Sequence, residues 1–136
     1  MKMKVNKLPI LLAFVAMAVS ILACGGSIST ANIGDAWLST DAEGNNRTTA
    51  FSQSDIMNLF IELKNAPDDT ELKVNWIAVN AEGIDPNFVI NESSFTSGND
   101  TVHFDLSNDN LWPAGSYKAD IYLNGTLDRS LTFDVQ

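Results

Sequence analysis

Nucleophilic catalysis needs a nucleophile beside a base, and the base must itself be oriented by a third group. The 136-residue chain contains one histidine, His103, and one cysteine, Cys24. His103 lies between Val102 and Phe104 in an alternating stretch, so we expect its ring to point to solvent from a strand. The sequence has no Gly-x-Ser-x-Gly element around a serine. We therefore predict no catalytic residues and a protein that is not an enzyme. A pocket that gathers two acids, or a rigid exposed loop, would instead favour an enzyme or an enzyme inhibitor.

Side-chain oxygens cluster in two segments, residues 41–46 and 107–110, and such oxygens can bind Ca²⁺. Neither segment fits the twelve-residue calcium loop that ends in glutamate. Asp, Asn and Gly are also the residues that turns select, so we interpret both segments as ordinary turns. Zinc would need more ligands than His103 and Cys24 supply. The sequence predicts no metal site and no cofactor.

Aromatic and large apolar side chains are the remaining candidates for recognition. Phe60, Ile77 and Tyr122 fall out of phase with the inward positions of their predicted strands. An outward Phe60 beside Ile77 would form a partner-binding patch. The alternative is that the first strand of the domain covers both side chains.

Exposed Trp and Tyr rings can also stack on sugars, which makes Trp37, Trp112 and Tyr122 candidates for carbohydrate or peptidoglycan binding. Trp112 precedes Pro113, and its ring can equally close one end of the core. The possible partner-binding residues are therefore Phe60, Ile77, Trp112 and Tyr122.

The first 24 residues have the composition of a secretory leader. Three lysines precede an apolar run over residues 8–23, and the run stops at Cys24. This run is shorter than the roughly 18–20 apolar residues that a spanning helix needs. An uncleaved membrane anchor is therefore the second interpretation.

The sequence Ile21-Leu22-Ala23-Cys24 resembles the lipobox of bacterial lipoproteins. In that family the leader is cut before the cysteine, whose sulfur becomes a lipid thioether. The resemblance implies a signal peptide at residues 1–23 and acylation of Cys24, for example by palmitate. Several acyl chains, at about 0.8 kcal/mol per buried methylene, would hold the protein on a lipid membrane almost permanently. Gly25 replaces the aspartate that favours the inner membrane, so the resemblance implies an outer-membrane or cell-surface location.

The mature chain is strongly acidic. Loss of the three leader lysines lowers the formal net charge from −9 to −12, and all 17 acidic residues remain. Such a charge repels phosphate backbones, so we expect no nucleic-acid partner. A single cysteine allows no disulfide within one chain, so the core alone must hold the domain. We expect a flexible tether over residues 24–31 and one domain over residues 32–136.

Alternating apolar and polar residues predict an all-β fold after the cleaved signal peptide. The clearest strands are residues 57–63, 72–76, 102–106, 117–123 and 131–135, and weaker ones are 33–40, 48–51 and 88–91. Strands with one apolar face must bury that face against a second sheet, which predicts an antiparallel β-sandwich.

The pair Asn124-Gly125 predicts a hairpin. A two-residue loop would place Tyr122 opposite Leu127 and then Lys118 opposite Leu131, mixing polar and apolar residues on one face. We therefore predict an odd-length loop with Gly125 as a left-handed bulge, which pairs Ile121 with Leu127.

The segment Gly115-Ser116-Tyr117-Lys118-Ala119 resembles the penultimate strand of immunoglobulin-like domains, with Ala119 in place of cysteine. In those domains the tyrosine hydroxyl bonds back to the preceding loop, and a tryptophan on the third strand, here Trp76, fills the core. The turn at residues 112–117 and the Tyr-Leu-Asn-Gly hairpin at 122–125 also resemble those of immunoglobulin-like domains in bacterial lipoproteins. The resemblance implies an immunoglobulin-like sandwich of about seven strands.

Together these patterns favour a lipid-anchored, extracytoplasmic, non-catalytic interaction or accessory module of the cell envelope. Its partners would be the membrane, through acylated Cys24, and an envelope protein. The alternatives are a carbohydrate- or peptidoglycan-binding module and an enzyme inhibitor. An immunoglobulin-like fold does not decide among them.

Overall fold

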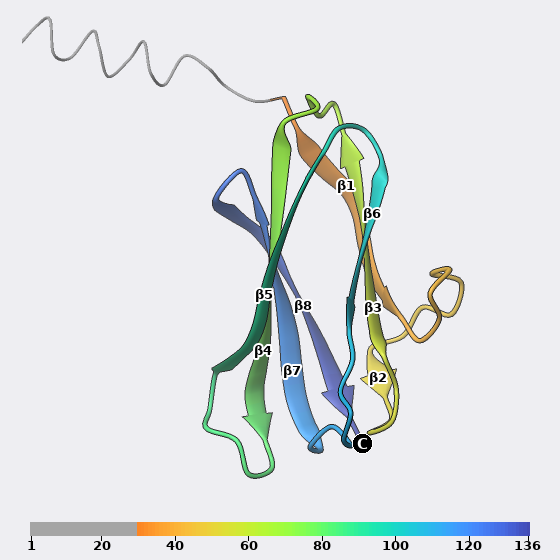
Figure 1. Cartoon of the computed structure of the whole chain (residues 1–136), viewed down its shortest axis with the longest axis vertical. Helices are drawn as coiled ribbons and strands as arrows, with labels where there is room; N and C mark the ends of the chain where they lie inside the picture. The colour runs from red at the N-terminus through yellow and green to blue at the C-terminus, as the bar shows by residue number, and fades with distance from the viewer. Residues whose placement is uncertain (1–29) are drawn as a thin grey trace, which may run out of the picture.

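The computed structural model of the chain describes residues 30–136, so the leader and Cys24 lie outside the described residues (Figure 1). Every secondary-structure element of the described part is a strand. The strands are β1 (Asn32–Ser39), β2 (Ala50–Phe51), β3 (Met57–Lys64), β4 (Thr70–Ala81), β5 (Phe88–Ser97), β6 (Thr101–Leu106), β7 (Gly115–Leu123) and β8 (Thr126–Val135). Within residues 30–136 we find no helix that is long and apolar enough to cross a membrane.

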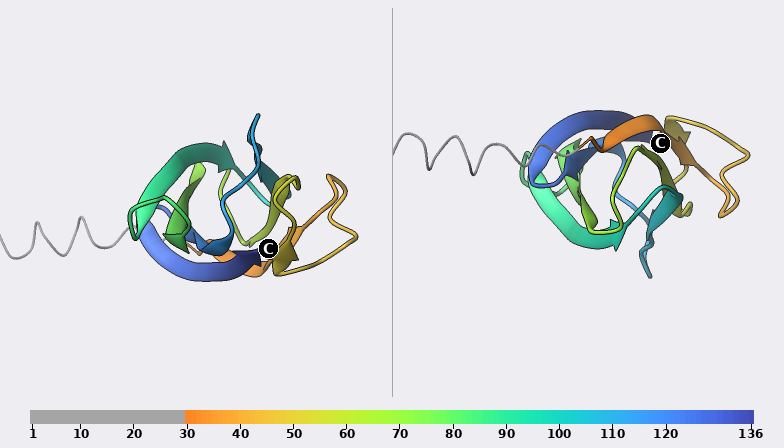
Figure 2. Two further views of the ribbon diagram at one scale, coloured as in Figure 1. Left: turned by 90° about the horizontal axis from the view of Figure 1, so that it is seen from below. Right: turned by 90° about the horizontal axis from the view of Figure 1, so that it is seen from above.

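The strands form two sheets that face each other (Figures 1 and 2). One sheet has the order β1-β3-β6, and the other has the order β2-β8-β7-β4-β5. All pairings are antiparallel except that of β2 with β8. The predicted all-β sandwich is confirmed.

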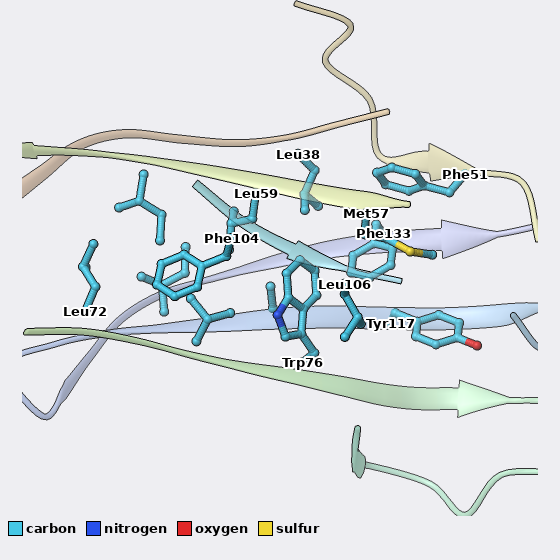
Figure 3. Packing of buried hydrophobic residues seen from close by; sticks show 14 of the residues in the cluster. Leu38, Phe51, Met57, Leu59, Leu72, Trp76, Phe104, Leu106, Tyr117 and Phe133 are labelled. Atoms are coloured by element: carbon cyan, nitrogen blue, oxygen red, sulfur yellow. The ribbon is translucent and has the colours of Figure 1, made fainter. Parts of the chain in front are cut away.

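The core lies between the sheets and consists of the inward residues of each alternating strand (Figure 3). Phe133 is at the centre of an aromatic cluster, since its ring centroid lies 5.4 Å from that of Phe51, 5.5 Å from Tyr117 and 6.2 Å from Trp76. Trp76 and Tyr117 are each 1% exposed. Trp76 therefore fills the core from β4, as the resemblance implied.

Tyr117 also links β7 to the loop before it. Its hydroxyl donates a hydrogen bond of 2.5 Å to the carbonyl of Pro113. Burial of the phenol raises the pKa of Tyr117. This is the corner that the immunoglobulin-like resemblance implies.

The β7–β8 hairpin differs from our prediction. Its loop has two residues, Asn124 at φ 49° and Gly125 at φ 84°, which are the two positive angles of a type I′ turn. Tyr122 does pair with Leu127, but Ile121 pairs with Arg129, so Asp128 is an extra residue in β8. The bulge restores the match between apolar residues, and an odd-length loop is not needed.

We predict that Trp76→Ala lowers the free energy of unfolding by about 3–5 kcal/mol, because it opens a cavity among the buried rings. Equilibrium denaturation in urea measures this change. The control Leu111→Ala, at a side chain that is 64% exposed, should change stability by less than about 0.5 kcal/mol. A loss below about 1 kcal/mol for Trp76→Ala would show that the ring does not carry the core.

Candidate functional site

The structure separates the residues of the predicted patch. Phe60 is on the outer side of the β1-β3-β6 sheet, whereas Ile77 is on β4 of the other sheet. Both are also buried, with exposed fractions of 7% and 9%. The interpretation of an exposed patch of Phe60 beside Ile77 is therefore wrong. The two side chains face away from the core on opposite outer faces of the sandwich.

Phe60 is the middle of a row of three rings. Trp37 on β1 stacks on it at 5.4 Å between centroids, and His103 on β6 stacks on its other side at 4.5 Å. The strand register places the three residues directly opposite one another, Trp37 against Phe60 and Phe60 against His103. The first strand thus covers Phe60, as the alternative interpretation held, but it does not cover Ile77, which lies on the other sheet.

The loop after β1 folds over this row of rings. The indole Nε1 of Trp37 donates a hydrogen bond of 3.0 Å to the carbonyl of Gly44. Gly44 is buried at φ +76°, and a Cβ at this position would lie 3.1 Å from two ring carbons of Phe60. Glycine is required here both by the backbone angle and by the space. The loop and the rings form a small second core outside the sandwich.

Asp41 holds the loop in this conformation. Its carboxylate accepts hydrogen bonds from the backbone N–H of Asn46 at 2.8 Å and of Asn45 at 3.1 Å, and from the hydroxyl of Ser39. These bonds, that of Ser39 first, lower the pKa of Asp41 to about 2. The carboxylate thus serves the turn itself, in agreement with our interpretation of residues 41–46. No group of three or more His, Cys, Asp or Glu with metal-binding geometry occurs in residues 30–136.

His103 is exposed on the outer face, as its place in the alternation predicted. Its Nε2 lies 2.8 Å from Oδ1 of buried Asn58, and its ring stacks on Phe60. These contacts orient the imidazole within the row of rings.

Trp112 closes one end of the core, as the second interpretation of this residue held, and it is not an exposed binding residue. The side chain is 6% exposed, and its Nε1 donates to the carbonyl of Asp55 at 3.1 Å. Its backbone N–H donates to the carbonyl of Gln53, whose side-chain Nε2 donates back to the carbonyl of Trp112. The indole thereby fastens the loop before β3 to the loop before β7. A ring in this position cannot stack on a sugar.

Tyr122 remains half-buried on the outer face of the five-stranded sheet. The Nζ of Lys73 on the neighbouring strand β4 lies 4.6 Å from its ring centroid. Among the four predicted partner-binding residues it is the one that the structure leaves partly accessible.

One side of the sandwich is closed by backbone and side-chain bonds between the sheets. The N–H of Thr48 donates to Leu38 on β1, and the N–H of Asp134 on β8 donates to Thr49. On the same side, near the start of β1, Nη2 of Arg129 donates to the carbonyl of Ile33 at 3.0 Å. The chain from β1 to β2 therefore crosses between the sheets and joins their edges.

A cleft of about 550 Å³ remains on this closed side. Its lining combines the indole of Trp37, the guanidinium of Arg47 and several hydroxyl groups. Arg47 lies over the indole, with its Cζ 4.0 Å from the ring centroid, and pairs with Asp35 at 3.0 Å. Because Phe60 stacks on Trp37 as well, the edge of the indole and not a free face borders the cleft.

The other side of the sandwich is open. There the terminal strands β5 and β6 border a cleft of about 360 Å³, lined by residues 93–95 and 100–105. β5 carries three half-exposed apolar side chains, Phe88, Val89 and Phe95, although our sequence analysis predicted only a weak strand to residue 91. An edge strand open on both faces has no buried period, so alternation could not reveal it. Phe95 within a run of Ser and Thr was the one available signal.

Comparison with known proteins supports the fold. The chain resembles an immunoglobulin-like protein from Pseudomonas aeruginosa with a TM-score of 0.53 and 13% sequence identity, over 81% of this chain and 99% of that one. It also resembles part of an alkylpurine DNA glycosylase from Pseudomonas fluorescens, solved bound to DNA containing an abasic site analog, with a TM-score of 0.52 and 13% identity over 79% of this chain. The match covers 31% of that glycosylase. No family model and no curated protein matches the sequence.

These likenesses show an immunoglobulin-like fold. The strand order and the tyrosine corner described above are those of this chain. At such low identity they carry no activity from one protein to another.

We predict that Asp41→Asn reduces the pH dependence of stability at acid pH. The pKa of Asp41 is about 2 in the folded chain and 3.8 without the fold, so its ionised form contributes stability above about pH 4. That contribution is lost as the pH falls from 3.8 towards 2. The measurement is the denaturation midpoint of both proteins between about pH 2 and 6. The two curves should converge at the acid end, and curves that stay parallel would contradict the assignment.

Proposed function

We propose that this chain is a lipid-anchored, extracytoplasmic, non-catalytic module of the cell envelope that binds a protein partner. The observation that carries the proposal is the exposed apolar surface of β5 at an unpaired sheet edge, on a domain whose other large apolar side chains are mostly buried. An unpaired sheet edge can pair with another chain, and apolar side chains along it offer that chain further surface to cover. The leader and Cys24 supply the attachment.

The arrangement of the ends fits attachment through the N-terminal side. β1 begins at one end of the sandwich, and the C-terminus lies at the opposite end (Figure 1). A tether over residues 24–31 can span at most about 28 Å. With Cys24 in a membrane, the loops beside the C-terminus would point away from the bilayer.

Two further exposed apolar residues lie at this far end. Ile56 precedes β3 and Leu111 precedes β7, and they are 46% and 64% exposed. The bonds of Trp112 to the loop before β3 hold the two loops together. They present a fixed apolar tip in addition to the edge of β5.

The non-catalytic part of the proposal rests on the surroundings of the reactive side chains. His103 is held by Phe60 and Asn58, and the carboxylate of Asp41 bonds to its own loop. Asp41 lines neither of the two clefts. His103 lines the open-side cleft together with Asp100 and Asp105, and its Nε2 lies within hydrogen-bond distance of Asn58.

A photocrosslinking experiment tests the protein partner. A photoreactive phenylalanine analogue is placed at Phe95, at Leu111, or at Asp85 as an exposed polar control, in the membrane-bound protein. The proposal is supported if position 95 or 111 yields one crosslinked protein that position 85 does not yield. Excess unmodified domain should also prevent this crosslink. No specific product from either apolar position would overturn the proposal.

Carbohydrate binding is a second candidate, favoured by the cleft beside Trp37. The residues that line the cleft include Arg47, Ser130 and Thr132, whose polar groups are of the kinds that bind sugar hydroxyls. It ranks second because both faces of the indole are occupied, by Phe60 and by Arg47. Glycan-array binding that disappears in Thr132→Val would support it, and an array without binding would exclude it.

We predict that Cys24→Ser moves the protein from the membrane to the soluble fraction, because serine offers no sulfur for a thioether. Carbonate-washed membranes and mass spectrometry of the intact protein measure the change. The wild type should begin at Cys24 and carry acyl mass, and the tether variant Ser27→Ala should behave in the same way. An intact leader, or an unmodified thiol at Cys24, would contradict the anchor.

A further inference from the structure

β5 and β6 end their sheets on the open side, where no strand of the described chain pairs with them, and β5 is the longer edge, with ten residues against six. β1 and β8 are tied together through Arg129 and Ile33, and β2 covers the end of β8. β5 has ten residues without Lys, Arg or Pro, and its single charge is Glu92. Natural sheets usually block such an edge with Lys, Pro or a bulge, because it can pair with another chain. The one bulge, at Ile90, leaves residues 91–97 in regular pairing with β4.

The hydrogen-bond pattern shows which backbone groups of β5 are free. The carbonyl of Glu71 on β4 accepts from Asn124, so the backbone groups of Glu71 point towards β7. Directions alternate along a strand, and those of Leu72 therefore point to β5, where Phe95 is its partner. The backbone groups of Phe95 are used in this pairing, and those of Ser94 point to the open edge.

The surroundings of this edge are acidic. The residues that line the open-side cleft include Asp100 and Asp105, and Glu92 is on β5 itself. Among the described residues that line the cleft there is no Lys or Arg.

The basic side chains of the described domain are engaged elsewhere. Four pair with a carboxylate, and Lys73 lies over Tyr122. The pairs are Arg47–Asp35 at 3.0 Å, Lys64–Glu62 at 3.1 Å, Lys118–Asp120 at 3.4 Å and Arg129–Asp128 at 2.7 Å. A second copy of this acidic chain is thus a poor electrostatic match for the edge, whereas a cationic segment is a good one.

We infer that the free edge of β5 binds an extended, cationic segment of a partner protein, which adds to the five-stranded sheet as a further strand. Backbone bonds to Ser94 and its alternate neighbours hold the segment. Its apolar residues cover Phe95, which is 53% exposed and shares the inner face of the sheet with its partner Leu72, and its basic residues lie on the outer face beside Glu92. This inference rests on the proposed function, because it identifies the chemistry of that partner and the surface that it meets.

The test uses a blocked peptide of about nine alternating Lys and Val residues as the probe, with isothermal titration calorimetry as the readout. Ser94→Pro removes a central N–H among those that point to the open edge, and Pro is tolerated there because β4 does not use that group. We expect Ser94→Pro to weaken binding at least about tenfold, while the matched control Ser94→Ala binds as the wild type does. Equal binding by all three proteins would overturn the inference.

Two further arms keep the result independent of folding defects in Ser94→Pro. A probe methylated on alternate backbone nitrogens can no longer pair as a strand, and a Glu-Val probe has the opposite charge. Each should bind the wild type at least about tenfold more weakly than the Lys-Val probe at low salt. A methylated probe that binds as tightly as the parent would overturn strand addition, and an acidic probe that binds equally would overturn the cationic partner.

The same variants separate this inference from the proposed function. If Phe95 crosslinks to a partner in the wild type and not in Ser94→Pro, both stand. If the crosslinked partner is unchanged in Ser94→Pro, the protein partner stands and strand addition falls. A dimer of the free domain in sedimentation that Ser94→Pro dissolves would assign the edge to a second copy and overturn the cationic segment.

Discussion

The packing of Trp76, Tyr117 and Phe133 between the sheets is the interaction on which the rest of the structure depends. The chain has a single cysteine, so no intrachain disulfide supports the sandwich. The free energy gained by burying these large rings therefore stabilises the pair of sheets, as a disulfide between the sheets does in antibody domains. Tyr117 extends this packing to the loop before β7 through its bond to Pro113, and Trp112 continues it to the loop before β3. The core and the end of the domain are thus one packed unit.

Much of this fold was predictable, because alternation reports burial on one face. Trp76 and Tyr117 were assigned to the core correctly. The hairpin was not, since a two-residue loop with a bulge at Asp128 keeps the apolar residues on one face as an odd-length loop would, but with different partners. Phe60 and Ile77 show a second limit: alternation tells which residues point outward, but not which sheet a strand joins or which loop folds over it.

The two sides of the sandwich differ in whether the backbone groups at the sheet edges are bonded. On the closed side, the chain from β1 to β2 and the side chain of Arg129 form hydrogen bonds with backbone groups at the edges of both sheets. A cleft remains on this side. On the open side, no strand of the described chain satisfies the outer groups of β5. Sequence alone could not reveal this difference, because it arises from which strands end each sheet. The polar Ser- and Thr-rich composition of β5 suits a strand that meets water on both faces.

The position of β1 also has a mechanical meaning. A pull through the N-terminal side enters at Asn32 and acts along β1, which is paired with β3 over the length of the strand. Bonds loaded along the strand direction share the force and must break together, whereas bonds at a hairpin end would open one after another. Arg129 adds a brace from β8 to the same strand, near the point where the pull enters. The described domain is thus built to stay folded under a pull that enters through its N-terminal side.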